Sequence, residues 1–295
     1  MSKLFDRTRN AHNPVSGGTV ITQTDSEHWV EELRRTGGIG AEIVETRLAK
    51  CRRTRLILPP DAPTLANPSV AQSSAMEAYR ILRTRIMRAQ AAQGLRSLLF
   101  SSAVSNEGKT FTTLNLAEAY AGLHDQRVLL IDGDLRTRSL SQCFAHVSGP
   151  GLSDALAGEA EFAEVILATD KANLFFVNTG KNATPPPELF ASQRWKEFLG
   201  WCSECFKVII VDAPPIFPLS DFDLMSAACD GIVLVVRAQR THRELLQKAS
   251  AQVDSKKLLG IVYNATTTEQ RKSKYNNPYL ASEPASCTSA LYGDS

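Results

Sequence analysis

Three segments of the sequence place groups that bind phosphate and metal ions directly after short apolar runs. The first, Ser101–Thr110, reads SSAVSNEGKT and precedes the helical stretch FTTLNLAEAYAGL. A strand, a loop ending in Gly-Lys-Thr and a helix form an arrangement whose backbone N–H groups surround phosphate oxygens. In such a loop Lys109 points its charge toward the β- and γ-phosphates, and the Thr110 hydroxyl ligates Mg²⁺. Because Ala103 holds the usual first glycine position, the loop alone is also compatible with a simple helix N-cap at Thr110.

The second and third segments end apolar runs with carboxylates. Val128–Arg136 reads VLLIDGDLR and carries Asp132 and Asp134, and Val208–Pro215 reads VIIVDAPP and carries Asp212. Two neighbouring carboxylates repel each other unless a cation lies beside them, and Mg²⁺ bound to phosphates is such a cation. An acid at the end of an apolar strand is also a common position for holding Mg²⁺ or water in nucleotide phosphatases and kinases. Since three strand ends carry complementary groups, the sequence predicts an ATP–Mg²⁺ site.

Short apolar runs separated by helical stretches would position these groups. The runs are Leu98–Ser101, Val128–Ile131, Leu174–Val177, Val208–Val211, Ile232–Val236 and Leu258–Tyr263. Several are apolar throughout, as expected for strands buried on both faces. Their alternation with helices predicts an α/β fold with a doubly wound, mostly parallel sheet and helices on both faces, whose ligands bind at the carboxyl ends of the strands. An amphipathic helix is expected over residues 74–91, where apolar residues recur at three- and four-residue spacing.

Composition and charge place limits on the class of protein. The chain has 295 residues, 43% of them hydrophobic, with 33 Lys and Arg against 31 Asp and Glu. This is ordinary for a globular protein, and a formal net charge of +2 gives no general case for a nucleic-acid partner. The apolar runs are too short to span a bilayer, and the N-terminus has no apolar core typical of a signal peptide.

Three regions follow from the patterns: an N-terminal extension and linker over 1–72, a nucleotide-binding domain over 73–268 and a flexible polar tail over 269–295. Two short helices are expected in the extension, over Ser26–Arg35 and Ala41–Arg53. The second ends in the basic run Lys50–Arg55. That run favours a solvated helix end, where cations complement the helix dipole, over a contact with acidic lipids or a partner.

Together these segments resemble the bacterial tyrosine kinases of capsule and exopolysaccharide synthesis, the BY-kinase family, over about residues 73–268. The resemblance rests on SNEGKT, VLLIDGDLR, VIIVDAPP, GLSDALAGE, TPPPELFAS and CDGIVLVVRAQRT. It implies a phosphate-loop fold that uses ATP and Mg²⁺ to phosphorylate protein tyrosines, including its own. Without a fused membrane-spanning module the chain resembles the split form, which is cytoplasmic, lies at the inner face of the plasma membrane and has a membrane polysaccharide co-polymerase as its activator.

The resemblance also implies roles for individual residues. The catalytic set would be Lys109, Asp132, Asp134 and Asp212. The metal would be held by Thr110, Asp132 and Asp212. Nucleotide contacts would come from Ser105, Asn106, Glu107, Gly108, Lys109, Thr110, Phe111 and Asn264. Subunits of a homo-oligomeric ring would meet at Glu77, Arg80 and Arg83, which i,i+3 spacing places on one helix face. The phosphate acceptors in the tail would be Tyr275, Tyr279 and Tyr292.

The sequence departs from the family's pattern at two places. Ser105 and Asn106 replace the usual Pro-Gly of the loop, and because Asn accepts a positive φ, we expect the turn to be kept. The tail carries three widely spaced tyrosines where the family usually has a dense cluster.

Two other functions compete with the kinase. One is an ATPase switch like the plasmid-partition and septum-positioning proteins, but these have an extra Lys at the position of Val104. The other is a non-catalytic, nucleotide-binding regulator of a membrane polysaccharide complex, which the sparse tyrosines leave open.

Overall fold

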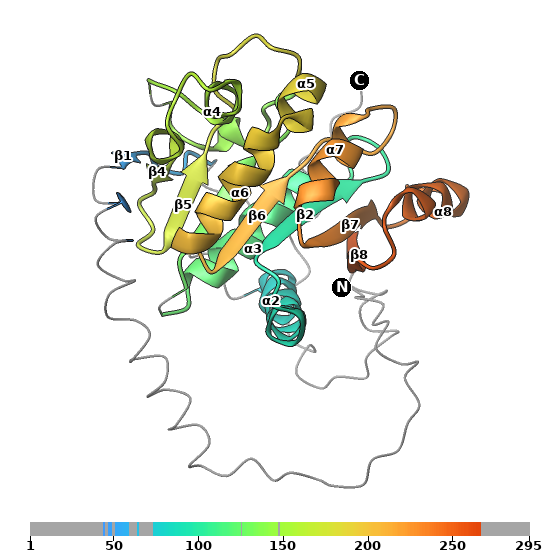
Figure 1. Ribbon diagram of the computed structural model, residues 1–295. Helices are drawn as coiled ribbons and strands as arrows, with labels where there is room; N and C mark the ends of the chain where they lie inside the picture. The colour runs from blue at the N-terminus through green and yellow to red at the C-terminus, as the bar shows by residue number, and fades with distance from the viewer. Residues whose placement is uncertain are drawn as a thin grey trace, which may run out of the picture.

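A computed structural model describes residues 44, 47–48, 51–58, 64 and 73–266, except 125 and 147. Within them, eight strands form one sheet in the order β1-β4-β5-β3-β6-β2-β7-β8 (Figure 1). All neighbouring strands are parallel except β4 and β5. The strands are β1 Arg52–Arg53, β2 Ser97–Ser102, β3 Val128–Asp132, β4 Leu167–Ala168, β5 Leu174–Val177, β6 Val208–Asp212, β7 Gly231–Arg237 and β8 Leu258–Asn264.

Helices cover both faces of this sheet. They are α2 Ser74–Gln93, α3 Lys109–Ala121, α4 Leu152–Ala157, α5 Pro186–Ala191, α6 Gln193–Cys205, α7 Asp221–Ala228 and α8 Arg243–Gln252, with 3₁₀ turns η1 Ser141–Cys143 and η2 Phe162–Val165. Helices α2 and α3 pack on one face and α4 to α8 on the other (Figure 1). Because side chains alternate along a strand, Leu98 and Phe100 of β2 join the first core, and Leu99 joins the second.

The predicted α/β architecture is confirmed. The six apolar runs are β2, β3 and β5 to β8, and the helix expected over 74–91 is α2. Helix α2 begins where the Ser73 hydroxyl accepts a hydrogen bond from the N–H of Met76, and it ends at Gly94 with φ +69°. Strands β1 and β4, each of two residues, are too short to have left a pattern in the sequence.

The helix expected over Ala41–Arg53 is wrong at its C-terminal end, because Arg52 and Arg53 form β1. The Arg52 guanidinium donates to the carbonyls of Pro150 at 2.9 Å and Glu164 at 2.8 Å, and also to that of Ser148. Arg52 therefore joins the sheet edge instead of ending a solvated helix. The expected helix over 26–35 lies outside the described residues, and the division at residues 72 and 268 stays a proposal.

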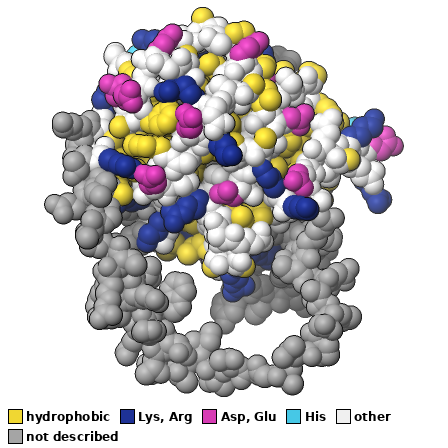
Figure 2. Space-filling model, viewed as in Figure 1, with side chains coloured by type: hydrophobic (Ala, Val, Ile, Leu, Met, Phe, Trp, Pro, Cys, Tyr) yellow, Lys and Arg dark blue, Asp and Glu magenta, His cyan; other side chains and the backbone are white. Residues whose placement is uncertain are grey.

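The described helices include none that is long and apolar enough to cross a membrane. On the face seen in Figure 2, basic and acidic side chains are interspersed. This distribution agrees with the near-zero net charge of the sequence.

Candidate active site

The loop between β2 and α3 turns sharply through two residues with positive φ and leads directly into the start of the helix. Asn106 has φ +65°, so the turn expected from its tolerance of positive φ is present. Gly108, with φ +88°, is the N-cap of α3, and a Cβ there would overlap the side-chain amide of Asn264. The first N–H groups of a helix have no partner within the helix, so the start of α3 at Lys109 offers donors to an anion.

Two long-range contacts brace this loop. The buried carboxylate of Glu107 accepts hydrogen bonds from the N–H of Val104, at 3.2 Å, and from the hydroxyl of Thr241. The side-chain amide of Asn264 donates to the Glu107 carbonyl at 3.1 Å. The Glu107 side chain therefore fixes the conformation of the loop, and Asn264 contacts the loop itself. The expected contact between Asn264 and the adenine base stays a proposal.

The carboxylates of Asp132 and Asp212 end two neighbouring parallel strands. Their Cα atoms are paired in the register of β3 and β6. Residues two apart in a strand point to the same face of the sheet. Leu130 lies two residues before Asp132 and Ile210 two residues before Asp212, and both belong to the core under α2 and α3. Both carboxylates therefore lie on the α3 side of the sheet. Both are buried, with 0% of Asp132 and 1% of Asp212 exposed. Two acids expected to serve one site are thus brought together by strand pairing.

Hydrogen bonding leaves one oxygen of each carboxylate free for a further ligand. Oδ2 of Asp132 accepts from both the N–H and the hydroxyl of Ser141, each at 2.7 Å. Oδ1 of Asp132 and Oδ1 of Asp212 are buried and lack a hydrogen-bond partner. Buried acceptors are rarely left unpaired, and carboxylate oxygens are the ligands that Mg²⁺ prefers. These atoms fit the metal expected from the sequence.

Burial, and to a smaller extent repulsion from neighbouring carboxylates, disfavours the charged forms of these acids. Burial, together with the charge of Asp212, raises the pKa of Asp132 to about 8, although the hydrogen bonds from Ser141 oppose the shift. Burial raises the pKa of Asp212 to about 7, while the Lys109 charge and a hydrogen bond from the Thr110 hydroxyl lower it. A divalent cation would relieve this strain on both carboxylates.

Lys109 and Thr110, at the start of α3, therefore both act on the carboxylate of Asp212. Lys109 is 8% exposed, so its ammonium group acts in a setting with little water to screen it. Within the described residues no set of three His, Cys, Asp or Glu side chains is arranged to hold a metal by itself. A metal at Asp132 and Asp212 would therefore need the Thr110 hydroxyl and phosphate oxygens to complete its ligands.

Asp134 and Arg136 follow β3 at the rim of the site. Asp134 is 5% exposed, and its Oδ1 accepts from the N–H of Thr137 at 3.1 Å. Arg136 donates two hydrogen bonds to the buried carboxylate of Asp221 at the start of α7, from Nε to Oδ2 at 2.8 Å and from Nη2 to Oδ1 at 3.0 Å. This bidentate pair joins the chain after β3 to α7.

Other predicted residues lie outside this cluster. Ser105 is exposed at the loop tip, and the Phe111 ring packs edge-on against Tyr79, with centroids 6.2 Å apart. On α2, Glu77 pairs with Arg80 at 2.9 Å, whereas Arg83 donates to the carbonyl of Ala119 on α3. The face expected to contact another subunit is thus partly used inside the chain. Tyr275, Tyr279 and Tyr292 lie outside the described residues.

Three residues of the site were not predicted from the sequence. They are Ser141 on Asp132, Thr241 on Glu107 and Asp221 on Arg136. Each is a common polar residue in a loop or at a helix end, and its partner is distant in the sequence or has no fixed spacing. A buried charge needs a partner, so knowledge that Glu107 and Asp221 are buried would have led to a search for their partners. The sequence around these residues does not show that they are buried.

The chain as a whole is similar to known proteins, among them two relatives by sequence and one solved structure. No protein-family model matches the sequence. The tyrosine-protein kinase YwqD of Bacillus subtilis (strain 168) is 31% identical over 190 residues, covering 64% of this chain and 80% of the relative. The putative tyrosine-protein kinase EpsB of Ralstonia solanacearum is 30% identical over 274 residues, covering 90% of this chain but 35% of the relative. The kinase domain of the Escherichia coli tyrosine kinase ETK matches with a TM-score of 0.61 and 30% identity, covering 72% of this chain and 85% of that one.

Proposed function

The chain belongs to the family of bacterial tyrosine-protein kinases, and from this premise we propose that it transfers the γ-phosphoryl group of ATP to protein tyrosines. The observation that carries the proposal is the pairing of Asp132 and Asp212 at the ends of β3 and β6, beside the charge of Lys109. Each of these acids has a buried, unpartnered oxygen at the point where the phosphates of a bound nucleotide would end.

In the proposed reaction each group of residues has a separate role, set by its position in the site. Backbone N–H groups from Ser105 to Phe111 bind the phosphates, and Lys109 neutralises the charge that develops on the β- and γ-phosphates. The bond from the γ-phosphorus to its bridging oxygen breaks, and the tyrosine oxygen takes its place. A carboxylate of the Asp132–Asp134 pair orients the hydroxyl and accepts its proton. Catalysis is then mostly positioning and charge stabilisation.

Thr110, Asp132 and Asp212 would hold the metal. When bound, Mg²⁺ supplies a positive charge that neutralises phosphate oxygens and orients them. The raised pKa values of Asp132 and Asp212 mean that both acids must lose their protons to act as ligands.

The physiological setting follows from the same premise. We propose that the kinase acts in capsule or exopolysaccharide synthesis at the inner face of the plasma membrane, where a membrane polysaccharide co-polymerase activates it. Subunits would form a ring through α2, with Glu77, Arg80 and Arg83 at the contact. Tyr275, Tyr279 and Tyr292 would then be acceptors that reach the active site of a neighbouring subunit, since tethering raises their effective concentration.

Incubation of the full chain with ATP and Mg²⁺, followed by phosphotyrosine detection and mass spectrometry, tests the proposal. We expect phosphotyrosine on the wild type, and none on Lys109→Met. Phosphate release without phosphotyrosine would favour the ATPase switch. ATP binding without either product would favour the non-catalytic regulator. Phosphate confined to residues before Thr266 would remove the tail as a substrate.

A further inference from the structure

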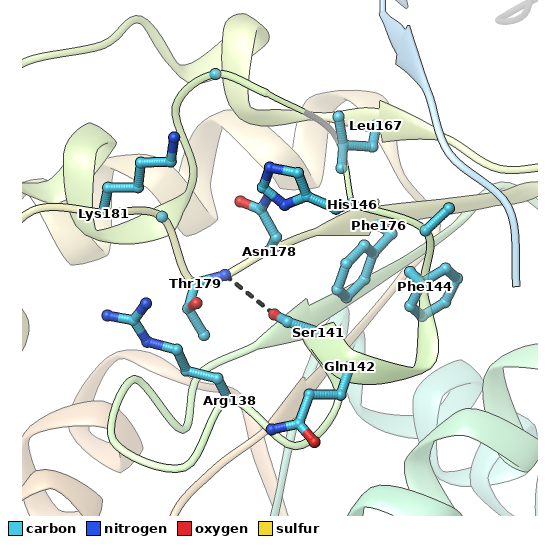
Figure 3. Close-up of a pocket in the computed structure, with 13 residues that line it drawn as sticks. Arg138, Ser141, Gln142, Phe144, His146, Leu167, Phe176, Asn178, Thr179 and Lys181 are labelled. Atoms are coloured by element: carbon cyan, nitrogen blue, oxygen red, sulfur yellow. Dashed lines mark hydrogen bonds between the residues drawn. The ribbon is translucent and has the colours of Figure 1, made fainter. Parts of the chain in front are cut away.

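A pocket lies beside the proposed catalytic carboxylates, on the other side of Ser141. It has a volume of about 270 Å³ and is bounded by the segment that follows β3 and by the end of β5. The rings of Phe144 and Phe176 are 3% and 1% exposed, so they close the inner side of the pocket as part of the core. In Figure 3 the charged ends of Arg138 and Lys181, both exposed side chains, lie away from these rings. The accessible side of the pocket is therefore its basic side.

This basic side suits a negatively charged group. Arg138, His146 and Lys181 line the pocket, and none of its described lining residues is acidic. In the part of the chain that the structure describes, neither Arg138 nor Lys181 forms an ion pair with a carboxylate. The nearby carboxylate of Asp154 is 8% exposed and accepts hydrogen bonds from the N–H groups of Gly151, at 2.7 Å, and Lys181, at 3.1 Å. Backbone groups therefore satisfy Asp154, and the two long basic side chains remain available to a ligand.

Ser141 joins this pocket to the active site. Its hydroxyl accepts a hydrogen bond from the N–H of Thr179 at 3.3 Å and donates to Asp132 at 2.7 Å. Ser141 and Thr179 both line the pocket. A group bound in the pocket and a tyrosine hydroxyl bound at Asp132 would therefore lie on two sides of a single residue.

An extended peptide could occupy both places at once. Side chains two residues apart in an extended chain point to the same side, and their backbone positions lie about 7 Å apart. An acidic side chain two residues from a tyrosine could therefore enter the pocket while the tyrosine reaches the carboxylates. The basic side chains would also offset the repulsion that Asp132, Asp134 and Asp212 exert on an acidic segment.

We infer that the pocket selects acceptor tyrosines by binding a carboxylate side chain two residues away from the tyrosine. Arg138 and Lys181 would then determine specificity, because they contact the acceptor segment but not the reacting atoms. The inference deepens the proposed function and rests on it for the reaction, whereas the pocket and its charge do not depend on it.

The tail of the chain contains one tyrosine with an acid at this spacing. Asp294 follows Tyr292 by two residues. The positions two residues before and after Tyr275 and Tyr279 hold uncharged residues, and Tyr275 directly follows the basic Lys274. Basic neighbours oppose binding to a basic pocket. Tyr292 is therefore the expected preferred acceptor of the three.

Phosphorylation of synthetic peptides by the full-length protein tests the inference. The peptide of residues 288–295, TSALYGDS, is compared with its Asp294→Asn form. We expect kcat/KM to be about three- to tenfold higher for the acidic peptide, as for two contacts between exposed charges. Equal values for the two peptides would overturn the inference.

Variants of the two cations locate the preference. Arg138 has φ +55°, so Arg138→Asn is the better substitution, because Asn accepts that backbone conformation. Arg138→Asn and Lys181→Ala should each reduce the preference for the acidic peptide, and the double variant should abolish it without slowing the Asp294→Asn peptide. Lys248→Ala, at an exposed position of α8, should keep the preference. An unchanged preference in the double variant would refute the assignment to this pocket.

A charge reversal guards against damage to the fold. Lys181→Glu should prefer an Asp294→Lys peptide over the acidic one, and a misfolded protein cannot produce such a reversal. A variant that still favours the acidic peptide as strongly as the wild type would exclude Lys181 from the contact.

Peptide binding without turnover separates this inference from the kinase proposal. Fluorescence anisotropy of labelled Tyr292→Phe peptides, with and without Asp294→Asn, measures the preference even if the chain makes no phosphotyrosine. Tighter binding of the acidic peptide that is lost in the Arg138→Asn, Lys181→Ala double variant would support the pocket in that case. Equal affinities would overturn it whether or not the chain is an active kinase.

Discussion

Ser141 holds Asp132 through two donors, because its backbone N–H and its hydroxyl both lie 2.7 Å from Oδ2 of that carboxylate. The two bonds fix the orientation of the side chain and leave Oδ1 without a partner in a buried position. In the proposed reaction Ser141 would be a positioning residue, which acts through the carboxylate that it orients.

Removal of the Ser141 hydroxyl should slow the reaction without weakening ATP binding. A hydrogen bond to a charged group contributes about 1.5–3 kcal/mol, so we expect Ser141→Ala to lower kcat about 10- to 100-fold with an unchanged KM for ATP. The hydroxyl also lowers the pKa of Asp132, so the acid limb of the pH–rate profile should move to higher pH. Ser141→Thr should restore part of the rate, and Ser139→Ala is the control. A purely structural role would leave the pH profile in place.

Loss of the Lys109 charge should abolish phosphoryl transfer while the fold remains. In Lys109→Met we expect a decrease in kcat of about 10²–10³ or more, as is typical for loss of one group that stabilises the transition state. Circular dichroism checks the fold, and Lys196→Met, exposed on α6, provides a matched control. ATP turnover close to that of the wild type would show that the phosphate site lies elsewhere.

Asp132, Asp134 and Asp212 should act as one unit. Groups that work together lose most of their function at the first removal, so the losses in the double Asn variants should be smaller than the sum of the single losses. Kinetics of the three single and three double variants measure this. Fully additive free energies would contradict a shared site.

The buried acids should destabilise the metal-free protein at high pH. Their folded pKa values, about 8 for Asp132 and about 7 for Asp212, lie above the ordinary value of about 3.9, so the folded state binds more protons than the unfolded chain. Their contribution to stability is therefore complete below about pH 4 and is lost as the pH rises through 7 and 8. In EDTA, Asp212→Asn should raise the Tm at pH 8.5 by a few degrees, at about 2–4 °C per kcal/mol, and by less at pH 5.5. A stabilisation that does not change with pH would contradict this reading.

Subunit contact through α2 is best tested at Arg80. Arg80 pairs with the exposed Glu77, and Ile81 beside it is 47% exposed, whereas Arg83 is bonded to α3. Charge reversal at Arg83 would therefore disturb helix packing as well. We expect Arg80→Glu to leave a folded monomer that still binds ATP, with Arg88→Glu, also exposed on α2, as the control. Light scattering that shows the same assembly in both variants would remove this contact.

Much of the fold was predictable because its signals are local. Strands buried on both faces are apolar runs, and a phosphate loop with its helix is one continuous segment. The meeting of Asp132 and Asp212 was also expected, because the carboxyl ends of parallel strands share one edge of the sheet.

The remaining features of the site depend on tertiary pairing. Glu107 and Thr241 are 134 positions apart, and Glu107 and Asn264 are 157 apart, so no window of sequence contains both partners. Ser141 lies in a 3₁₀ turn nine positions after Asp132, a distance set by how that one turn folds. The burial that raises the pKa values of the two acids likewise exists only once the sheet and α3 have come together.

Strand β1 has a practical consequence for work on this protein. The segment from Cys51 to Leu58 pairs with β4 and also bonds to the chain near Phe144. A shortened protein that began at Ser73, where the nucleotide-binding pattern starts, would lose this segment and leave β4 as an unprotected edge. Uncovered strand edges recruit other strands, so such a protein should self-associate in a way unrelated to any ring. A protein that retains residues 51–58 would keep β4 covered, so any oligomer that it forms could be distinguished from aggregation through an exposed strand edge.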